Sequence, residues 1–493
     1  MKSKKRHTND FSPIIIKENS HLLAAPIVIL FNQSINQGKF PSLLKRARVV
    51  PLYKKGSKSD LNNYRPISLL NIFSKIFEKL MKLHLNDFIE NNNIISNCQF
   101  GFQKGECTQD ALIKFSNLLY NNLDNSNHVL SIFIDFSKAF DTVPHDILLQ
   151  KMDHYGIKGN VNNWFKSYLS DRFQQTCVNG NLSNSQKIEL GVPQGSVLGP
   201  ILFLLFINDL PNVSEILNTI LFADDANLTL TGKDPVVMIN TANIELNKFY
   251  FWCLANRLSV NILKTNYIIF SNRPPTTLPP LLLKSHFTYE VIKQVDNIKF
   301  LGVFYDQTMT FKFHNKYIAQ RLARTSALIY RLKDIMPTFV LKTLYHAHVT
   351  SIVTYCNIIW ANTYDTHTKP VLLMLKRIIR NIARADYFAH TQPIYNNLQI
   401  LNFEGIRKLS LAKHFIIHNT TFAHLLPNHD YRTRNRHRLR LPDRNGTLYE
   451  RSYLYQAPAF WTKFSSTLTD QELTSLSTKA LTNKVKRYLL SQP

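Results

Sequence analysis

The tetrapeptide FADD at positions 222–225 places two adjacent carboxylates between apolar residues on both sides. Neighbouring carboxylates repel each other, and an apolar setting opposes their ionisation. A further acid, Asp135, ends the apolar run HVLSIFID at 128–135, which predicts a buried strand. Residues 216–231 predict a strand, a turn that carries the two acids, and a second strand. A fold that keeps these acids needs a positive charge to stabilise them.

The three acids meet at one end of a sheet if the two predicted strand segments are neighbours. Oxygen-only ligands in such a cluster select Mg²⁺ or Mn²⁺. A pair of these ions activates an attacking hydroxyl and stabilises a leaving oxygen on phosphorus. The pattern therefore indicates metal-assisted phosphoryl transfer. The alternative is a pair of exposed turn aspartates, because aspartate is common in turns.

The charge of the chain indicates a polyanionic partner. The 59 Lys and Arg residues exceed the 33 Asp and Glu residues, which gives a net charge of +26. Such an excess favours nucleic acid or an acidic membrane surface as partner, and the alternative is a basic surface that serves solubility. Hydrophobic residues make up 44% of the chain, so most of it is expected to be globular.

Secretion and membrane insertion are not expected. The longest apolar run, 197–207, contains Gly199 and Pro200 and is shorter than the roughly 20 residues of a spanning helix. The basic N-terminus is not followed by a signal-peptide core. The five cysteines show no CxxC pair, which argues against a disulfide framework and a zinc knuckle. We expect an intracellular protein, nuclear or cytoplasmic or both, with no membrane partner.

Hydrophobic periodicity predicts an α+β unit that ends near residue 306. It predicts strands at 46–53, 128–135, 258–270 and 298–306, a hairpin that turns at Asn179–Gly180, and helices at 68–90, 109–123, 146–169 and 236–255. Beyond residue 310 only helices are predicted, at 312–333, 338–350 and 369–384. The last hundred residues lose clear periodicity and contain the basic run YRTRNRHRLR at 431–440.

A series of motifs occurs in a fixed order over residues 43–306. They are ARVVPLYKKGSKSDLNNYRPISLL (47–70), QFGFQKGECTQDAL (99–112), FIDFSKAFDTVPHDILL (133–149), GVPQGSVLGPILFLLFINDL (191–210), LFADDANL (221–228), LSVNILKTNYIIF (258–270) and FLGVFYD (300–306). The series resembles the reverse transcriptase of non-LTR retrotransposons of the LINE type, most closely the Jockey-like elements. The resemblance implies a right-hand polymerase with fingers and palm over 1–306, a helical thumb over 307–385, and a basic region of uncertain role over 386–493.

The resemblance implies roles for the acids and one lysine. Asp135, Asp224 and Asp225 are the implied catalytic metal ligands, with two Mg²⁺ ions, or Mn²⁺ in their place. Lys264 is placed to protonate the departing pyrophosphate. The alternative for Lys264 is an exposed side chain on a strand edge.

The resemblance also implies the nucleotide pocket. Arg65 is expected to grip the triphosphate, assisted by a lysine of the turn at 54–58, for which we take Lys55. Phe140 is expected beneath the sugar of the incoming nucleotide, where its ring favours deoxynucleotides. Gln194 and Gly195 are expected to line the template-nucleotide pocket. The alternatives are a solvated basic turn for the lysines and an ordinary core residue for Phe140.

The primer end is expected at the turn formed by Phe300, Leu301 and Gly302. The implied partners are an RNA template, a DNA primer or target DNA, and deoxynucleoside triphosphates. The implied activity is RNA-directed DNA polymerisation, a nucleotidyl transfer. Oligomeric state is not predicted.

Two departures from the family favour another reading. Gln103 stands where relatives commonly have arginine after QFGF, although Lys104 follows it. The polymerase region begins within some forty residues of Met1, so we expect no N-terminal endonuclease domain. The alternative function is a truncated, inactive retroelement remnant that only binds nucleic acid. A group II intron maturase is a weaker alternative, because its motif wording differs.

The C-terminal half carries two further patterns. Alternating arginines at 432–440 would form a ladder for phosphates if that segment is extended. His414, His418, His424 and His429 form a loose series in which one pair has i, i+4 spacing. No cysteine accompanies them, so satisfied or exposed histidines are expected rather than a zinc site.

Overall fold

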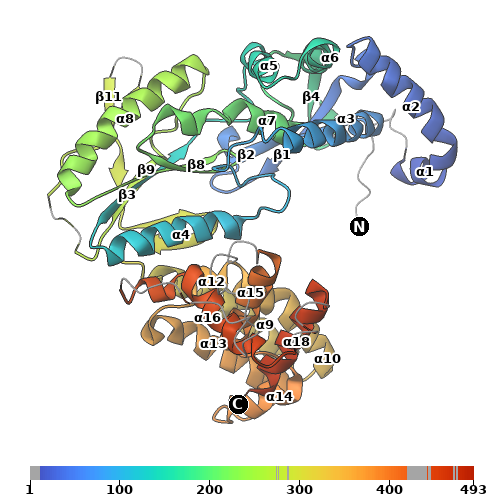
Figure 1. Ribbon diagram of the computed structural model, residues 1–493. Helices are drawn as coiled ribbons and strands as arrows, with labels where there is room; N and C mark the ends of the chain where they lie inside the picture. Colours follow the sequence, from blue (N-terminus) through green and yellow to red (C-terminus); the bar gives the residue numbers. More distant parts are fainter. Residues whose placement is uncertain are drawn as a thin grey trace.

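The computed structural model describes residues 12–273, 275, 277–285, 288–418, 441, 446–469, 472 and 476–492. Figure 1 shows an α/β part formed by the first three hundred residues and a helical part formed by the rest, with helix α4 (Thr108–Asp124) between them. The predicted α+β class is confirmed. The arginine run at 431–440 and His424 and His429 lie outside the described residues.

The central sheet of the α/β part has the strand order β12-β9-β3-β8-β7. Its strands are β12 (Lys293–Gln294), β9 (Asn266–Phe270), β3 (His128–Asp135), β8 (Asp225–Gly232) and β7 (Asn218–Phe222). The strands β3 and β8 are antiparallel neighbours, so the predicted adjacency is correct. The central position of β3 explains its nearly continuous apolar sequence, because both of its faces are covered.

Alternate side chains of β3 enter two different cores. Leu130, Ile132 and Ile134 pack into the core that contains α7 (Gly199–Ile207) and α8 (Pro235–Ala255). Val129 packs into the core that contains α4 and the helical part. Every residue of α7 except Pro200 is buried, which explains why this helix reads as an apolar run without a polar face.

A second sheet has the order β2-β1-β4-β5, with β6 paired to β4. Its strands are β1 (Arg46–Tyr53), β2 (Tyr64–Leu70), β4 (Arg172–Val178), β5 (Asn181–Leu182) and β6 (Gln186–Ile188). The predicted helix at 68–90 is wrong in its first residues, because Ser68 pairs with Val49 in β2. The helix α3 is Ile72–Asn91, and the Asn71 side chain accepts a hydrogen bond from the Phe73 amide to cap it.

Two other predicted strands differ from the structure. The segment 258–270 forms a strand only over β9, so Lys264 lies in the turn before the strand. The segment 298–306 forms two strands, β13 (Asn297–Phe300) and β14 (Val303–Asp306), which pair as a tight hairpin. Leu301 and Gly302 form its turn with φ values of 42° and 87°, a conformation that apolar periodicity does not reveal.

The remaining elements of the α/β part cover the sheets. They are α1 (Pro13–Glu18), α2 (Ser20–Asn36), α5 (His145–His154), α6 (Gly159–Leu169), β10 (Leu282–Ser285) and β11 (Thr288–Val291). The segment 146–169, predicted as helical, forms two helices, α5 and α6, with a short connection between them. No helix among the described residues is long and apolar enough to cross a membrane.

The helical part packs around the pair α9 (Lys312–Leu332) and α13 (Asp365–Ala383). Its other helices are α10 (Thr338–Leu344), the π-helix η4 (Tyr345–Thr350), α11 (Ser351–Thr354), α12 (Asn357–Trp360), α14 (Thr391–Leu398), α15 (Phe403–Ile417), α16 (Tyr453–Ser465) and α18 (Thr478–Ser491). One hydrophobic core joins α4, the β13–β14 hairpin and the helices of the helical part from α9 to α16.

An ion pair ties α4 to α15. The Asp110 carboxylate lies 2.7 Å from His414 Nε2, although 304 positions separate the two residues. Desolvation opposes ionisation of Asp110, but hydrogen bonds from His414 and Cys107 outweigh it and lower the Asp110 pKa to about 2. The C-terminal helices are therefore anchored to the same helix that packs on β3 and β7.

Candidate active site

The strand register brings two of the three acids side by side. Asp135 ends β3 directly opposite Asp225, the first residue of β8. Asp224 lies in the turn between β7 and β8, after Ala223, whose φ is +56°. Side chains opposite each other in an antiparallel pair lie on the same face of the sheet. The predicted convergence of the acids at one sheet end is therefore what the structure shows.

The turn that carries the acids is held by the QFGF motif. The Gln99 side-chain oxygen accepts hydrogen bonds from the Ala223 amide at 3.0 Å and the Gly101 amide at 2.8 Å. The Phe100 amide donates to the Leu221 carbonyl at 2.8 Å. A Cβ at Gly101 would lie 2.3 Å from the Ala223 nitrogen, so only glycine fits this close approach. The motif thus fixes the backbone of the FADD turn.

The acids perturb one another. Desolvation and the neighbouring carboxylates of Asp224 and Asp135 raise the Asp225 pKa to about 6. Desolvation and Asp135 also raise the Asp224 pKa, and a backbone hydrogen bond and the positive charges of Arg65 and Lys54 partly offset this. Such a cluster favours cation binding, because a bound cation relieves the repulsion among the carboxylates.

Basic side chains reach the acids from two directions. Lys264 Nζ lies 3.7 Å from Asp135 Oδ2, although both side chains are largely exposed. Arg65 in β2 and Lys54 at the end of β1 act on Asp224 from the other sheet. Lys54 also acts on Asp225, whereas Lys55 lies exposed in the following turn and does not contribute to either pKa. The basic turn therefore faces the acids through Lys54.

A cavity of about 350 Å³ opens beside the acids. Asp135, Asp225 and Lys264 line it together with Phe300 and Leu301 of the β13–β14 hairpin. Two residues of the predicted primer-end turn thus share one cavity with three of the four predicted catalytic residues.

The hairpin turn is fixed by a residue of the helical part. The Tyr355 hydroxyl donates to the Leu301 carbonyl at 2.7 Å. A Cβ at Gly302 would lie 2.9 Å from the Tyr355 ring, so glycine allows the ring to cover the turn. Phe300 is buried, and its ring packs against Phe133 with a centroid separation of 5.1 Å. Phe300 therefore anchors the turn in the core.

The predicted template-pocket residues lie on a loop pressed against β2. The Ser68 amide donates to the Gln194 carbonyl at 2.7 Å. Gly195 has a φ of +107°, and a Cβ there would lie 2.8 Å from the Ser68 carbonyl oxygen. The Gln194 amide nitrogen donates to both carboxylate oxygens of Asp141 at 2.9 Å. Asp141 therefore fixes the orientation of the Gln194 side chain.

Phe140 lies half-buried between this loop and the acid-bearing strand. Its ring stacks on Phe203 of α7 with a centroid separation of 4.4 Å. The Val192 amide donates to the Phe140 carbonyl at 2.8 Å. Phe140 thus combines a packed face with the partial exposure that a contact with substrate requires.

Gln103, which departs from the family pattern, and the following Lys104 have different surroundings in the structure. The Gln103 side-chain nitrogen is buried without a described hydrogen-bond partner. Lys104 forms an exposed ion pair with Glu90 at 3.2 Å. Lys104 is therefore engaged at the surface of α3 in this structure.

Three residues outside the predicted site support it, namely Gln99, Asp141 and Tyr355. Gln99 and Asp141 stand inside recognised motifs, so the motifs signal their importance but not their hydrogen bonds. Tyr355 stands in the helical part, where no pattern connects it to a hairpin turn fifty-four positions earlier.

The family model for reverse transcriptase (RNA-dependent DNA polymerase) matches residues 53–305. This range contains the three acids, the QFGF motif and the hairpin turn. The match therefore coincides with the part of the chain in which the structure assembles the site.

Curated relatives extend the similarity into the helical part. The chain is 28% identical over 414 residues to a probable RNA-directed DNA polymerase from transposon BS of Drosophila melanogaster, covering 78% of the chain and 44% of the relative. It is 29% identical over 398 residues to that of the X-element (79% and 43%) and 26% identical over 439 residues to that of the mobile element jockey (84% and 47%), both from the same organism. The chain spans less than half the length of these relatives.

Among solved structures, apo telomerase from Candida tropicalis matches with a TM-score of 0.40 and 10% identity, over 78% of this chain and 67% of that one. A likeness at this level adds nothing about function.

Proposed function

The chain belongs to the reverse transcriptase (RNA-dependent DNA polymerase) family, and from that premise we propose that it extends a primer 3′-hydroxyl with deoxynucleotides on an RNA template. The relatives from jockey and related elements support a non-LTR retrotransposon as its origin. The observation that carries the proposal is the register that sets Asp135 opposite Asp225 with Asp224 in the adjoining turn.

The three carboxylates fit divalent metal ions. They are oxygen donors at one sheet end, and desolvation and their mutual repulsion raise the Asp225 pKa to about 6. Reverse transcriptases generally depend on a divalent metal. We assign Asp135, Asp224 and Asp225 as the groups that hold two Mg²⁺ ions, for which Mn²⁺ can substitute. When bound, the ions would lower the pKa of the primer hydroxyl and neutralise negative charge on the leaving pyrophosphate.

Residues of the second sheet and its loops bind the nucleotide. Arg65 already acts electrostatically on Asp224, which supports its assignment to the triphosphate. Lys54 shares this position, so it assists Arg65 together with or in place of Lys55. A triphosphate bound here replaces protein carboxylates as the partner of these cations.

The sugar and template contacts follow from the loop at 191–196. Phe140 is assigned to the face of the deoxyribose, where a ribose 2′-hydroxyl meets the ring. Gln194, oriented by Asp141, and Gly195, which lacks a side chain beside β2, are assigned to the template nucleotide.

Lys264 is assigned to proton donation. Its ammonium group lies 3.7 Å from Asp135 Oδ2 in the metal-free protein and is more than half exposed. The position is compatible with a proton donor to the departing pyrophosphate. The turn Phe300–Leu301–Gly302 is assigned to the primer end, because Phe300 and Leu301 line the same cavity as Lys264, Asp135 and Asp225.

The substrates place this activity inside the cell, in the nucleus, the cytoplasm or both. The partners are the template RNA, a DNA primer or target DNA, and deoxynucleoside triphosphates. The net charge of +26 supports a polyanionic partner of this kind.

The deciding experiment is primer extension on poly(rA) with an oligo(dT) primer and Mg²⁺. We expect extension by the wild-type protein and none by Asp224→Asn. The matched control is Asp153→Asn, an exposed aspartate on α5 that is not part of the site, which is expected to extend as the wild type does.

A folded wild-type protein that binds the primer–template but does not extend it would contradict the proposal. That result would favour the alternative, a retroelement remnant that only binds nucleic acid. Circular dichroism and a duplex-binding measurement on the same samples show that the protein used is folded and competent to bind.

A further inference from the structure

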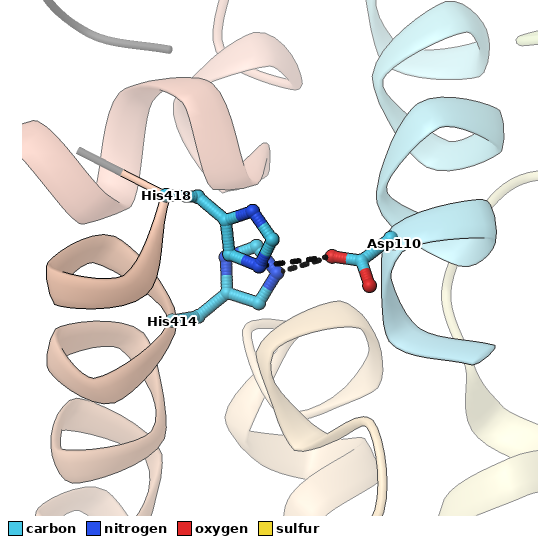
Figure 2. Close-up of side chains that lie close together, drawn as sticks. All are labelled: Asp110, His414 and His418. Carbon is cyan, nitrogen blue, oxygen red and sulfur yellow. Dashed lines mark hydrogen bonds and ion pairs between the residues drawn. The ribbon is translucent and has the colours of Figure 1, made fainter. Parts of the chain in front are cut away.

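Three potential metal ligands converge where α15 meets α4, away from the acids of the sheet. One ligand atom each from Asp110, His414 and His418 lies within 4.8 Å of the other two. Figure 2 shows both imidazole rings approaching the same oxygen of Asp110 from α15, while Asp110 projects from the facing helix α4. The sequence alone presents only the two histidines, because Asp110 is 304 positions from His414.

The separations of the two histidine nitrogens from Asp110 Oδ1 are compatible with ligation of one ion. His414 Nε2 lies 2.7 Å and His418 Nε2 3.6 Å from Asp110 Oδ1. In tetrahedral zinc sites, bonds of about 2.0–2.2 Å separate neighbouring ligand atoms by roughly 3.4 Å. An ion could therefore be accommodated with shifts of less than about 1 Å in the His414–Asp110 separation.

Hydrogen bonding alone does not explain the position of His418. The distance of 3.6 Å from His418 Nε2 to Asp110 Oδ1 is too long for a hydrogen bond. The His418 ring instead stacks on His414, with centroids 4.3 Å apart and planes inclined by 19°. Two imidazoles that present Nε2 to one carboxylate oxygen form a ligand set for a borderline cation.

The surroundings supply the support that a metal ligand needs. His414 Nδ1 lies 2.7 Å from the Tyr453 hydroxyl of α16, which fixes the ring and leaves Nε2 toward Asp110. Metal-binding histidines commonly have such a partner on the second nitrogen. Asp110 and His414 are nearly buried, whereas the His418 side chain is 29% exposed and gives an ion access from solvent.

We propose that Asp110, His414 and His418 bind one Zn²⁺ ion that joins the C-terminal helices to α4. Nitrogen donors and a coordination number of four suit zinc and disfavour Mg²⁺, which takes oxygen ligands in octahedral geometry. A water molecule would complete the four-coordinate set. The ion is structural and separate from the metals of the polymerase site.

The test is zinc binding by the full chain after removal of metals with EDTA. We expect one equivalent of Zn²⁺ to bind in competition with a fluorescent zinc chelator, and excess Mg²⁺ not to displace it. Co²⁺ used as a probe should give the visible absorption of a tetrahedral site. Bound Zn²⁺ should also raise the melting temperature, because it binds only the folded arrangement.

His418→Ala is the informative variant. It removes one ligand and leaves the His414 contacts with Asp110 and Tyr453 intact, so the protein is expected to fold without metal as the wild type does. We expect its zinc affinity to fall by at least about tenfold. Removal of a residue that only hydrogen-bonds to a metal ligand already lowers metal affinity by about that factor. The control is His348→Ala, an exposed histidine on η4, with unchanged affinity.

Two outcomes overturn the proposal. One is a wild-type protein that takes up no zinc in competition with the chelator. The other is a His418→Ala protein that binds zinc as tightly as the wild type, which would place any bound ion elsewhere.

Discussion

Two clusters of ionisable side chains in this protein shift the pKa of an aspartate in opposite directions. In the sheet, Asp135, Asp224 and Asp225 face one another, and desolvation and repulsion raise the Asp225 pKa to about 6. At the contact between α4 and α15, Asp110 faces two histidines, and its pKa is lowered to about 2. Basic side chains offset the repulsion in the first cluster only in part, whereas hydrogen bonds to Asp110 outweigh desolvation in the second.

The sheet cluster is suited to binding a cation, whereas the cluster at the α4–α15 contact holds two helices together. Like charges in the sheet lower the stability of the fold unless a cation binds, so this end of the sheet favours the binding of a metal ion. The hydrogen bond between Asp110 and His414 stabilises the α4–α15 contact even without an ion, because both side chains are nearly buried. Substitution of the aspartate should therefore have opposite effects in the two clusters.

Asparagine at Asp135 and at Asp110 gives the largest expected contrast. Asp135→Asn removes a proposed metal ligand and one of three repelling charges. We expect primer extension to fall by roughly 10³-fold or more, equivalent to about 4 kcal/mol, while the melting temperature of the metal-free protein rises or stays the same.

Asp110→Asn should show the reverse. It replaces a charge-assisted hydrogen bond with a weaker one, and we expect the free energy of unfolding to fall by about 2 kcal/mol. Primer extension measured below the melting temperature should stay within about tenfold of wild type, because Asp110 does not touch the acids of the sheet. Equal loss of extension in both variants would break the distinction between the clusters.

Gln99→Leu tests whether the sheet cluster depends on the turn that carries it. The substitution keeps the size of the side chain but removes the acceptor for the Ala223 and Gly101 amides. A displaced turn should lower kcat by about 10–100-fold while the KM for the nucleotide changes little. Steady-state extension rates at varied dTTP measure both, with Gln150→Leu, an exposed glutamine on α5, as control. A change in KM alone would contradict the role in positioning.

Titration of Asp225 sharpens the comparison through pH. A carboxyl group with a folded-state pKa of about 6 binds its proton more tightly than the unfolded chain, where the pKa is 3.8. Its contribution to stability is therefore present below pH 3.8 and is lost as the pH rises through 6. Metal-free protein should become less stable from pH 5 to pH 7, and Asp225→Asn should reduce that decrease.

The measurement is the melting temperature against pH in EDTA and in Mg²⁺. Solvent access to the Asp225 side chain limits the expected effect to about 1 kcal/mol or less. Mg²⁺ should weaken the pH dependence, because it favours the ionised carboxylates. The same slope in wild type and Asp225→Asn would show that the acids do not repel one another as described.

Tyr355→Phe has the smallest expected effect. It removes the hydroxyl that donates to the Leu301 carbonyl and keeps the ring that covers Gly302. Without this hydrogen bond the ordered hairpin turn should be destabilised by about 1 kcal/mol, which should weaken primer–template affinity by about fivefold or less. Fluorescence anisotropy of a labelled duplex measures it, and Tyr330→Phe on the exposed face of α9 is the control.

Local patterns predicted the elements of the sheet well. The strand at 128–135 and the helices at 109–123 and 236–255 match β3, α4 and α8 to within a residue at most ends, because apolar periodicity there is long and continuous. The family resemblance, and with it the reverse transcriptase assignment, is confirmed by the match over residues 53–305. The individual roles of the site residues stay predictions.

Short elements and turns were predicted less well. Residues 68–70, the end of β2, are predicted as the start of a helix, and the hairpin β13–β14 is predicted as one strand. In both cases the decisive interactions come from elsewhere in the chain. Ser68 is held by β1 and by the loop at Gln194, and the turn at Leu301 is held by Tyr355. Local periodicity cannot register partners supplied by distant segments.

The sequence alone placed each acid at the end of a predicted strand or in the turn beside one, because long apolar runs mark those strands. Only the tertiary structure decided what holds them there, namely Gln99 beneath the FADD turn and Lys264, Arg65 and Lys54 around it. Only the tertiary structure brought Asp110 to His414 and His418, because α4 and α15 meet through a core formed by the whole chain. The position of a strand along the chain follows from local apolar periodicity, whereas the pairing of distant strands and the contacts between helices depend on how the entire chain packs.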